Sequence, residues 1–442
     1  MPRATGRLRR GHRAGSFAGV TARGGHLTEP AQLPGAGSTA RRAWWLVAIL
    51  WVAFFLNYCD RQVVFSLFPL LKRDLHFTDV QLGLTASVFL WIYGLCSPIA
   101  GQIGDRVSKR MLIICSLLAW SVATVLTGFS NSATMLLGLR AVIGVTEAFF
   151  FPAAFALIAN AHPPATRSRA LAFFHTAQIA GIIGGGWFGG FMAEGFHWRL
   201  SFLVLGMAGI LYALPCFIYL RNVSEEAAVE TKKSGSRLAV KELARVPTYC
   251  VLCVVFPMFV FVTWLLSGWL TTFLHEKFSL GLKDAALAAT LYQQGATVVG
   301  VVGGGVLADW LFQRTTAARY WIIGAGLLLC APSVHFLGNS DSLVQTKLAA
   351  VAFGLTSGLV IANLMAASFD VVPVDTRASA AGVLNLVGGL VAGLGTWLGG
   401  ALKETVGIHK LLSLSAVLCV VAAVLVAVTI RFLFQRDYQR VH

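Results

Sequence analysis

Residues 44–71 read WWLVAILWVAFFLNYCDRQVVFSLFPLL, a run that is apolar for nearly its whole length. An α-helix needs about 20 apolar residues to cross the roughly 30 Å hydrocarbon core of a bilayer, so this run is long enough for one crossing. It nevertheless carries Asp60 and Arg61 side by side in its interior. A charge within a bilayer is costly and usually faces a partner or a cavity. The run therefore predicts a membrane-spanning helix, and its two charges mark a candidate functional site.

Similar apolar runs recur along the rest of the chain. Hydrophobic residues make up 57% of the 442 residues, charged residues make up 12%, and the mean hydropathy is +0.73. Soluble domains carry about a quarter charged residues, so the composition predicts a polytopic membrane protein without a sizeable soluble domain. We expect an all-α membrane protein with twelve transmembrane helices, at residues 44–70, 80–103, 111–130, 133–159, 170–193, 200–220, 248–274, 285–308, 319–337, 345–369, 378–401 and 410–433.

The formal net charge of +16 reflects an uneven distribution of Lys and Arg between the two faces. If the N-terminus is cytoplasmic, 25 of the 35 Lys and Arg residues lie on the cytoplasmic face and 8 on the opposite face. Cytoplasmic loops of membrane proteins carry such an excess. The sequence therefore predicts an integral protein of the inner (plasma) membrane with both termini cytoplasmic. Because the charge is explained by topology, we expect no nucleic-acid partner.

A polar segment, residues 222–247, separates six predicted helices from six others. We expect an N-terminal six-helix bundle at 44–221, a cytoplasmic linker at 222–247, a C-terminal six-helix bundle at 248–434 and a cytoplasmic tail at 435–442. Residues 1–43 hold eight arginines and a single acid, so they are predicted to form a disordered basic cytoplasmic tail. An organellar transit peptide is the alternative interpretation of this segment.

Two pairs of loops show that the halves resemble each other. GQIGDRVSKR (101–110) follows the second predicted helix, and GVLADWLFQR (305–314) follows the eighth. Likewise PPATRSRALA (163–172) precedes the fifth helix, and PVDTRASAAG (373–382) precedes the eleventh. The number of residues that separates the two members is nearly the same for both pairs. This pattern predicts two six-helix repeats related by a pseudo-two-fold axis.

The first of these loops carries a family resemblance. GQIGDRVSKR resembles the G-x-x-x-D-R-x-x-[KR]-[KR] loop of the major facilitator superfamily, and the resemblance extends from about Trp44 to Leu433. It implies the major facilitator fold, which agrees with the two repeats. The resemblance also implies a cytoplasmic gate formed by Gly101, Gly104, Asp105 and Arg106.

Four ionisable residues lie well inside the predicted helices: Asp60, Arg61, Arg140 and Glu147. Arg140 and Glu147 are seven residues apart in LRAVIGVTEAFFFPA (139–153), which places them on one helix face about 10 Å apart. Gly144 between them permits a close neighbouring helix. The four charges cancel, so a buried ion-pair network that only fixes helix packing is one interpretation. The glycine-rich surroundings and the depth in the membrane favour a transport site.

The pattern of these charges narrows the resemblance. NYCDR (57–61) together with R-x6-E (140–147) resembles the anion:cation symporter branch of the superfamily, and also the spinster branch of lipid transporters. The symporter resemblance implies that Asp60 and Glu147 bind protons, while Arg61 and Arg140 hold a substrate carboxylate. It further implies substrate contacts by Tyr58, Tyr93, Gln178 and Asn385.

We therefore predict a secondary active transporter that carries a small organic anion, a carboxylate or a sugar acid, together with protons by alternating access. A spinster-type lipid or lysolipid transporter and a transport-derived sensor without flux are the alternatives. The sequence contains no H-E-x-x-H or G-x-S-x-G motif, so we expect no enzyme. We also expect a monomer without a cofactor or a bound metal.

Two further motifs are interpreted as packing features. GIIGGGWFGG (181–190) lacks the strand–turn–helix setting of a phosphate-binding loop, so we expect it to pack closely against a neighbouring helix. Cys250 and Cys253 form a C-x-x-C motif without His or acidic neighbours. We expect them to be small apolar packing residues.

Overall fold

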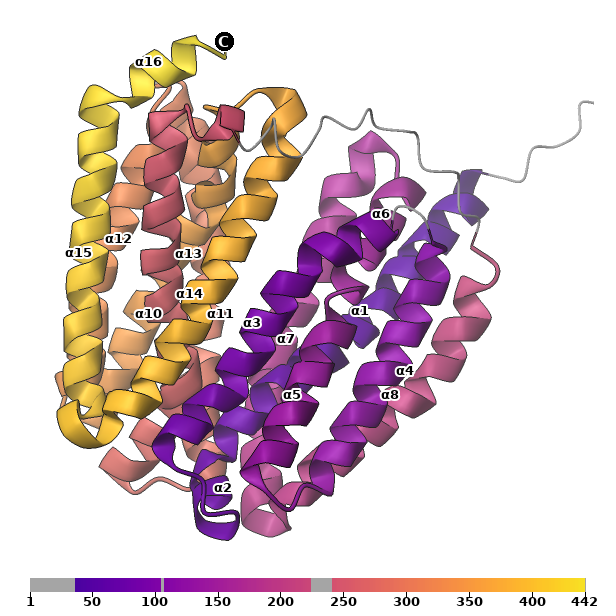
Figure 1. Ribbon diagram of the computed structural model, residues 1–442. Coiled ribbons are helices and arrows are strands. Elements are labelled where there is room, and N and C mark those ends of the chain that lie inside the picture. The colour runs from indigo at the N-terminus through magenta and orange to yellow at the C-terminus, as the bar shows by residue number, and fades with distance from the viewer. Residues whose placement is uncertain (1–35, 105–106, 224–240, 442) are drawn as a thin grey trace, which may run out of the picture.

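The computed structural model describes residues 36–104, 107–223 and 241–441, and every regular element in those ranges is a helix. The N-terminal half contains α1 (Ala36–Ser66), α2 (Phe68–Asp74), α3 (Asp79–Gly104), α4 (Lys109–Gly128), α5 (Ala133–Glu147), α6 (Phe150–Ala161), α7 (Pro164–Gly195) and α8 (Trp198–Leu220). The C-terminal half contains α10 (Pro247–Phe278), α11 (Leu282–Phe312), α12 (Ala318–Asn339), α13 (Leu343–Phe369), η1 (Val374–Thr376), α14 (Arg377–Val406), α15 (Ile408–Phe432) and α16 (Phe434–Gln439). Figure 1 shows the two halves as separate bundles of long helices.

The length and surface of these helices suit a lipid environment. Among the described residues, eleven spans are long and apolar enough to cross a membrane, with α5 and α6 together forming one of them. The twelfth long helix is α7, which has 32 residues and contains the glycine-rich stretch 181–190. Large apolar side chains such as Leu211, Val306 and Phe432 are exposed on the outside of the bundles. Such surfaces are stable in hydrocarbon, where helices satisfy their own backbone hydrogen bonds.

Equivalent helices in the two halves pack against equivalent neighbours. Helix α1 packs on α7 as α10 packs on α14, and α4 packs on α8 as α12 packs on α15. The pairs α3 with α5 and α11 with α13 follow the same rule. The pattern extends across the halves, where α3 contacts α14 and α7 contacts α11. The predicted pair of six-helix bundles, each repeating the other, is therefore confirmed.

Both predicted tails contain helix where the structure describes them. Helix α1 begins at Ala36, so residues 36–43 are helical, while residues 1–35 lie outside the described residues. Helix α16 lies in the predicted C-terminal tail, and its Asp437 accepts a 2.9 Å hydrogen bond from the Thr248 backbone amide. Tertiary contacts therefore hold a segment that the sequence analysis predicted only as a cytoplasmic tail. Of the predicted linker, residues 224–240 also lie outside the described residues.

The glycine-rich stretch of α7 packs closely against two helices. A Cβ atom at Gly185 would lie 2.6 Å from the Cα of Cys59 on α1, and one at Gly190 would lie 2.6 Å from the backbone oxygen of Leu282 on α11. Only a residue without a side chain permits these approaches. The stretch therefore brings α7 against its own bundle and against the opposite half, as the packing interpretation predicted.

The two halves contact each other near the end that holds α2. Ser87 on α3 donates a 2.7 Å hydrogen bond to the Gly393 carbonyl on α14, and Trp91 donates a 2.9 Å hydrogen bond to the Leu390 carbonyl. At the contact between α7 and α11, Glu194 of α7 accepts a 3.2 Å hydrogen bond from the backbone amide of Lys283, in the first turn of α11. Toward the end that holds α16, the helices of the two halves diverge (Figure 1). We call the joined end the α2 end.

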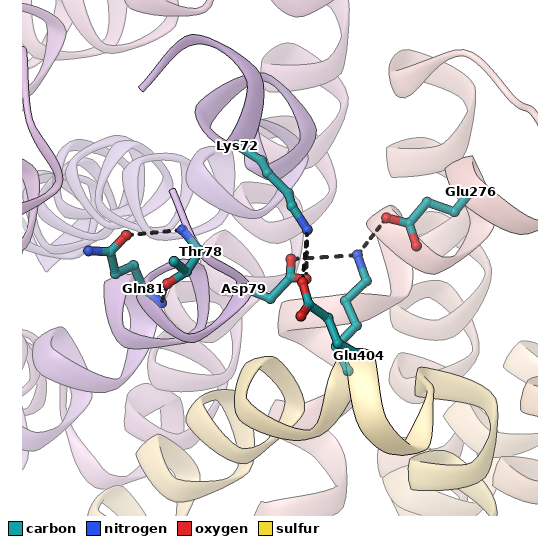
Figure 2. A network of polar contacts seen from close by, with 7 residues as sticks. Lys72, Thr78, Asp79, Gln81, Glu276 and Glu404 are labelled. Carbon is teal, nitrogen blue, oxygen red and sulfur yellow. Dashed lines mark hydrogen bonds and ion pairs between the residues drawn. The ribbon is translucent and has the colours of Figure 1, made fainter. Parts of the chain in front are cut away.

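A network of ion pairs crosses the α2 end. Lys72 Nζ lies 2.7 Å from one Asp79 carboxylate oxygen, and Lys403 Nζ lies 3.7 Å from the other. Lys403 also lies 2.5 Å from Glu276, and Lys72 lies 3.7 Å from Glu404. Figure 2 shows Asp79 between residues of the two halves. Lys72 belongs to the N-terminal half and Lys403 to the C-terminal half. The buried carboxylate of Asp79 pairs with both lysines and therefore connects the two halves.

Candidate functional site

Two helices of the N-terminal half supply the four membrane-embedded charges. Asp60 and Arg61 lie on α1, and Arg140 and Glu147 lie on α5. Their exposed fractions are 2%, 8%, 1% and 0%, in that order. The structure therefore buries all four, and Arg61 is the most accessible of them.

Arg61 is the centre of the cluster. Its Nε lies 2.6 Å from Glu147 Oε2, which makes a buried ion pair between α1 and α5. Its guanidinium carbon also lies 4.7 Å from the ring centroid of Tyr58, 4.7 Å from that of Tyr93 and 4.9 Å from that of Phe89. Aromatic rings attract a guanidinium through their negative faces, and the attraction is stronger when water is excluded. One carboxylate and three rings thus hold this charge in place.

Asp60 and Arg140 have incomplete sets of partners within the described residues. Thr124 on α4 donates a 2.6 Å hydrogen bond to Asp60 Oδ2, and Arg140 Nε donates a 3.2 Å hydrogen bond to the Thr85 carbonyl on α3. Asp60 Oδ1, Arg140 Nη1 and Glu147 Oε1 have no protein hydrogen-bond partner among these residues. A buried polar atom without a partner costs about 1–3 kcal/mol, and more when it is charged. The cluster therefore has both donor and acceptor positions for an added group.

Two local features of the chain shape the cluster. A Cβ atom at Gly144 would lie 2.8 Å from the Phe89 carbonyl oxygen, so this glycine lets α5 approach α3 closely, as predicted. The span containing Arg140 and Glu147 is interrupted after Glu147, and α6 begins at Phe150. Pro152 explains the interruption, because it has no amide hydrogen to donate to the carbonyl four residues earlier. Glu147 is therefore the last residue of α5, beside a break in the helix.

The remaining predicted substrate contacts are placed differently. Tyr58 and Tyr93 flank Arg61, as described above. Gln178 is half-buried on α7, three residues after His175. Asn385 is exposed on α14, in the opposite half. The partners described for the four charges all come from the N-terminal half.

The predicted cytoplasmic gate falls at the far end of α3. Gly101 and Gly104 belong to the last turn of this helix, whereas Asp105 and Arg106 lie outside the described residues. Nearby, Arg110 donates hydrogen bonds of 3.1 and 2.9 Å to the carbonyls of Arg221 and Val223, at the end of α8. A cation at a helix C-terminus also interacts favourably with the helix dipole.

Three contacts of the cluster were not predicted from the sequence. Thr85 contributes only a backbone carbonyl, which leaves no trace in the sequence. Phe89 resembles any other apolar residue of a membrane helix. Thr124 was the only one with a signal, since it is a polar residue within the apolar run at 111–130.

The structure also assigns packing roles to polar groups elsewhere. Asn363 donates hydrogen bonds to the carbonyls of Gly304 and Leu359, which joins α13 to α11. The Cys250 thiol lies 3.5 Å from the Ala244 carbonyl, and all eight cysteines are free. The interpretation of the C-x-x-C motif as a packing feature agrees with these contacts.

In the described part of the chain, eleven membrane-suited spans and the long helix α7 form two repeated bundles, one of which holds a buried charge cluster, and this arrangement is typical of a membrane carrier. The profile of the Major Facilitator Superfamily matches residues 50–396. The chain belongs to this superfamily, whose members are transporters rather than enzymes. It is therefore an integral membrane protein and a secondary transporter.

Several known proteins are similar to this chain. The probable sulfoacetate transporter of Cupriavidus necator is 29% identical over 320 residues, which cover 68% of this chain and 70% of the relative. The D-galactonate transporter of Escherichia coli O6:H1 is 25% identical over 383 residues, which cover 80% and 88%. Among solved structures, a bacterial homologue of the human lysosomal transporter spinster, in an inward-facing and occupied conformation, has a TM-score of 0.75. It is 22% identical in sequence, and the match covers 89% of this chain and 97% of that one.

Proposed function

We propose that the chain is a proton-coupled symporter of a small organic anion, with Asp60 and Glu147 as the proton-binding groups. Arg61 and Arg140 bind the substrate's carboxylate or a similar anionic group. The 2.6 Å ion pair between Arg61 and Glu147, buried beside Arg140, is the observation that supports this proposal most directly. It places a titratable acid in direct competition with any anion that approaches Arg61.

The charge balance of the cluster couples proton binding to substrate binding. With both acids ionised, the two acids and two arginines sum to zero, and Glu147 occupies Arg61. A proton on Glu147 removes the negative partner of Arg61, and a buried charge left without its partner is destabilised by roughly 3–5 kcal/mol. An anionic substrate restores the pairing. Proton binding and substrate binding therefore favour each other, and a proton gradient can drive uptake when the two bundles alternate in access.

Tyr58, Tyr93, Gln178 and Asn385 complete the proposed substrate site. The two tyrosines carry hydroxyl groups beside Arg61, where they can bind polar atoms of a substrate. Asn385 lies on α14 in the opposite half, so in this proposal it contacts the substrate only when the bundles approach each other. The sulfoacetate and galactonate named for two relatives are both small organic anions, which supports this class of substrate.

The proposed orientation follows from the charges outside the membrane. We assign both termini to the cytoplasm of a cell with this protein in its inner (plasma) membrane, because Lys and Arg are concentrated on that face. The α2 end then faces outward and is closed, and the state described is accessible from the cytoplasm. In this scheme Gly101, Gly104, Asp105 and Arg106 form the gate that closes in the opposite state.

Transport by purified protein in proteoliposomes tests the proposal. Candidate organic acids, including sulfoacetate and galactonate, are added outside vesicles that contain a pH indicator. We expect acidification of the lumen only with a transported anion, and loss of accumulation in Asp60→Asn and Glu147→Gln. Asp284→Asn, which changes an exposed acid in the first turn of α11, is the matched control and should transport normally. Uptake that does not depend on a pH gradient would contradict proton coupling.

Two other outcomes would identify the alternatives. Competition by lysophospholipids, without competition by organic acids, would indicate a spinster-type lipid transporter. Specific ligand binding without flux in either direction would indicate a sensor derived from a transporter.

A further inference from the structure

The hydroxyl group of Thr124 connects the charge cluster to the backbone of α4. Its Oγ1 lies 2.6 Å from Asp60 Oδ2 and 2.9 Å from the carbonyl oxygen of Trp120, one turn earlier on the same helix. Thr124 is 1% exposed and Asp60 is 2% exposed, so water does not replace either contact. Both distances are suitable for hydrogen bonds.

A single hydroxyl hydrogen makes one strong, well-aligned hydrogen bond at a time. When Asp60 is ionised, the hydroxyl donates to Oδ2. When Oδ2 carries a proton, that proton is donated to Oγ1, and the hydroxyl hydrogen turns to the Trp120 carbonyl. A hydroxyl has one donor and two acceptor positions, so the same heavy-atom geometry satisfies both forms of the acid.

We propose that Thr124 is the positioning residue that lets Asp60 gain and lose its proton without rearrangement of the helices. The proposal rests on the proposed function, in which Asp60 binds a coupled proton, and adds a residue that does not itself bind substrate or proton. Thr124 exchanges one hydrogen-bond partner for another as the proton arrives, whereas an ordinary acceptor or donor would suit only one state.

Other groups that act on Asp60 come from two helices. Arg61 and Cys59 are its neighbours on α1, and Arg140 and Glu147 act from α5. These groups determine how strongly the cluster as a whole holds a proton. On α4, the Thr124 hydroxyl contacts Asp60 and carries no charge, so it can be replaced without changing any of these charged groups.

Thr124→Val removes the hydroxyl but keeps the branched shape. Both forms of Asp60 lose one hydrogen bond, but a bond to a charged acceptor is about twice as strong as a neutral one. The ionised form is therefore destabilised more, and the variant should bind its proton more tightly. We expect the midpoint pH of Asp60 protonation to rise by about 0.5–1 unit. Thr124→Ser keeps the hydroxyl and should retain the original midpoint.

Infrared difference spectroscopy measures this midpoint without transport. The carboxylic acid band of Asp60 is assigned by its loss in Asp60→Asn and is followed against pH in purified protein. An alkaline shift in Thr124→Val but not in Thr124→Ser is the expected result. Equal midpoints in all three proteins, or the same shift in both variants, would overturn the proposal. If the Val variant does not elute as a folded monodisperse protein, Thr124→Ala replaces it.

Uptake assays separate this proposal from the proposed function. The pH profile of substrate uptake should shift in the same direction as the infrared midpoint, with Thr124→Ser unchanged. If the infrared midpoint shifts in Thr124→Val but wild-type uptake does not depend on the pH gradient, the positioning role is supported and proton coupling is refuted. If wild-type uptake is proton-coupled but Thr124→Val leaves both midpoints unchanged, coupling stands and the positioning role fails.

Discussion

At the scale of single residues, the surroundings of Arg61 combine an ion pair with three aromatic faces. Guanidinium is planar and delocalised, so it can stack against Tyr58 or Tyr93 while an N–H group points along its plane to a carboxylate. A lysine ammonium has no such plane and is more strongly hydrated. The choice of arginine at this position is therefore a choice of geometry as well as of charge.

Replacement of Arg61 by lysine tests this geometry. We expect Arg61→Lys to fold but to lose roughly tenfold or more in kcat/KM, because it keeps the charge and loses the planar contacts. Initial uptake rates in proteoliposomes measure the effect. Arg73→Lys, at an exposed arginine of α2, is the control and should match the wild type. Full activity in Arg61→Lys would show that only the positive charge matters.

The grouping of the four charges could be predicted because each has few alternatives in a bilayer. Asp60, Arg61, Arg140 and Glu147 must compensate one another when no other charged group lies at their depth. The finer pairing could not be predicted. Which acid pairs with Arg61 depends on the rotation of α1 against α5, and a single sequence does not determine that rotation.

At the scale of helices, close approach depends on glycine at particular positions. Gly144→Ala places a methyl group 2.8 Å from the Phe89 carbonyl, so α5 must move away from α3. Overpacking of this kind costs about 1–3 kcal/mol. We expect a lower melting temperature of the purified protein and reduced uptake, because Arg140 and Glu147 move with α5.

Gly138 provides a control on the same helix. A Cβ atom at Gly138 would meet no atom of the described residues within 4 Å. Alanine is a better helix former than glycine by up to about 1 kcal/mol in soluble helices, so Gly138→Ala should be neutral or slightly stabilising. Equal destabilisation by the two alanine substitutions would show that helix contact is not the cause.

The helix boundaries were only partly predictable from apolar runs. The run at 133–159 predicted one helix, whereas the structure divides it into α5 and α6 near Pro152. Pro152 was the available signal for this break, but a hydropathy pattern alone does not detect it. The helical start at Ala36 and the docked α16 were not predicted either, because composition says nothing about the tertiary contacts of a short polar segment.

At the scale of the whole molecule, the network around Asp79 fixes how the halves meet. Asp79→Asn removes the negative charge between Lys72 and Lys403, and the two lysines then repel each other. We expect the α2 end to open in a larger fraction of molecules. Spin labels at Arg73 and Lys410, in a background without the eight native cysteines, should report longer distances across this end.

Glu404 provides the control for this experiment. Its side chain is 77% exposed and lies 3.7 Å from Lys72. Exposed ion pairs contribute at most about 1 kcal/mol. Glu404→Gln should therefore leave the distance distribution unchanged, and an equal effect of the two substitutions would contradict a special role for Asp79.

The contribution of Lys72 to this network should also be insensitive to pH near neutrality. The hydrogen bond from Lys72 to Asp79 raises the pKa of Lys72 above its ordinary value of 10.5. A raised lysine pKa means that the contact stabilises the closed end fully below pH 10.5, and that this contribution is lost as pH rises through the raised pKa. The spin-label distances should stay constant from pH 7 to 10. A change within that range would show that Lys72 is not protonated throughout it.

The network itself was beyond prediction from the sequence. Its members lie in loops and at helix ends, where charged residues are ordinary, and they are far apart along the chain. The fold was predictable because every apolar run had to become a helix, and repeated loops indicated the duplication. Contacts between the halves depend on which conformation the molecule occupies, and the sequence encodes more than one.

Two hydrogen bonds between α3 and α14 use side-chain donors on α3 and main-chain acceptors on α14. Ser87 and Trp91 donate through their side chains to the main-chain oxygens of Gly393 and Leu390, and Ser87 also lies 2.8 Å from the Thr396 hydroxyl. Every amino acid offers that same oxygen, so mutation of α14 cannot delete the receiving atom and can only displace it by bulk. Side chains elsewhere on α14 can therefore change while these two bonds persist, as long as α3 keeps its two donors and Gly393 stays without a side chain opposite Trp91.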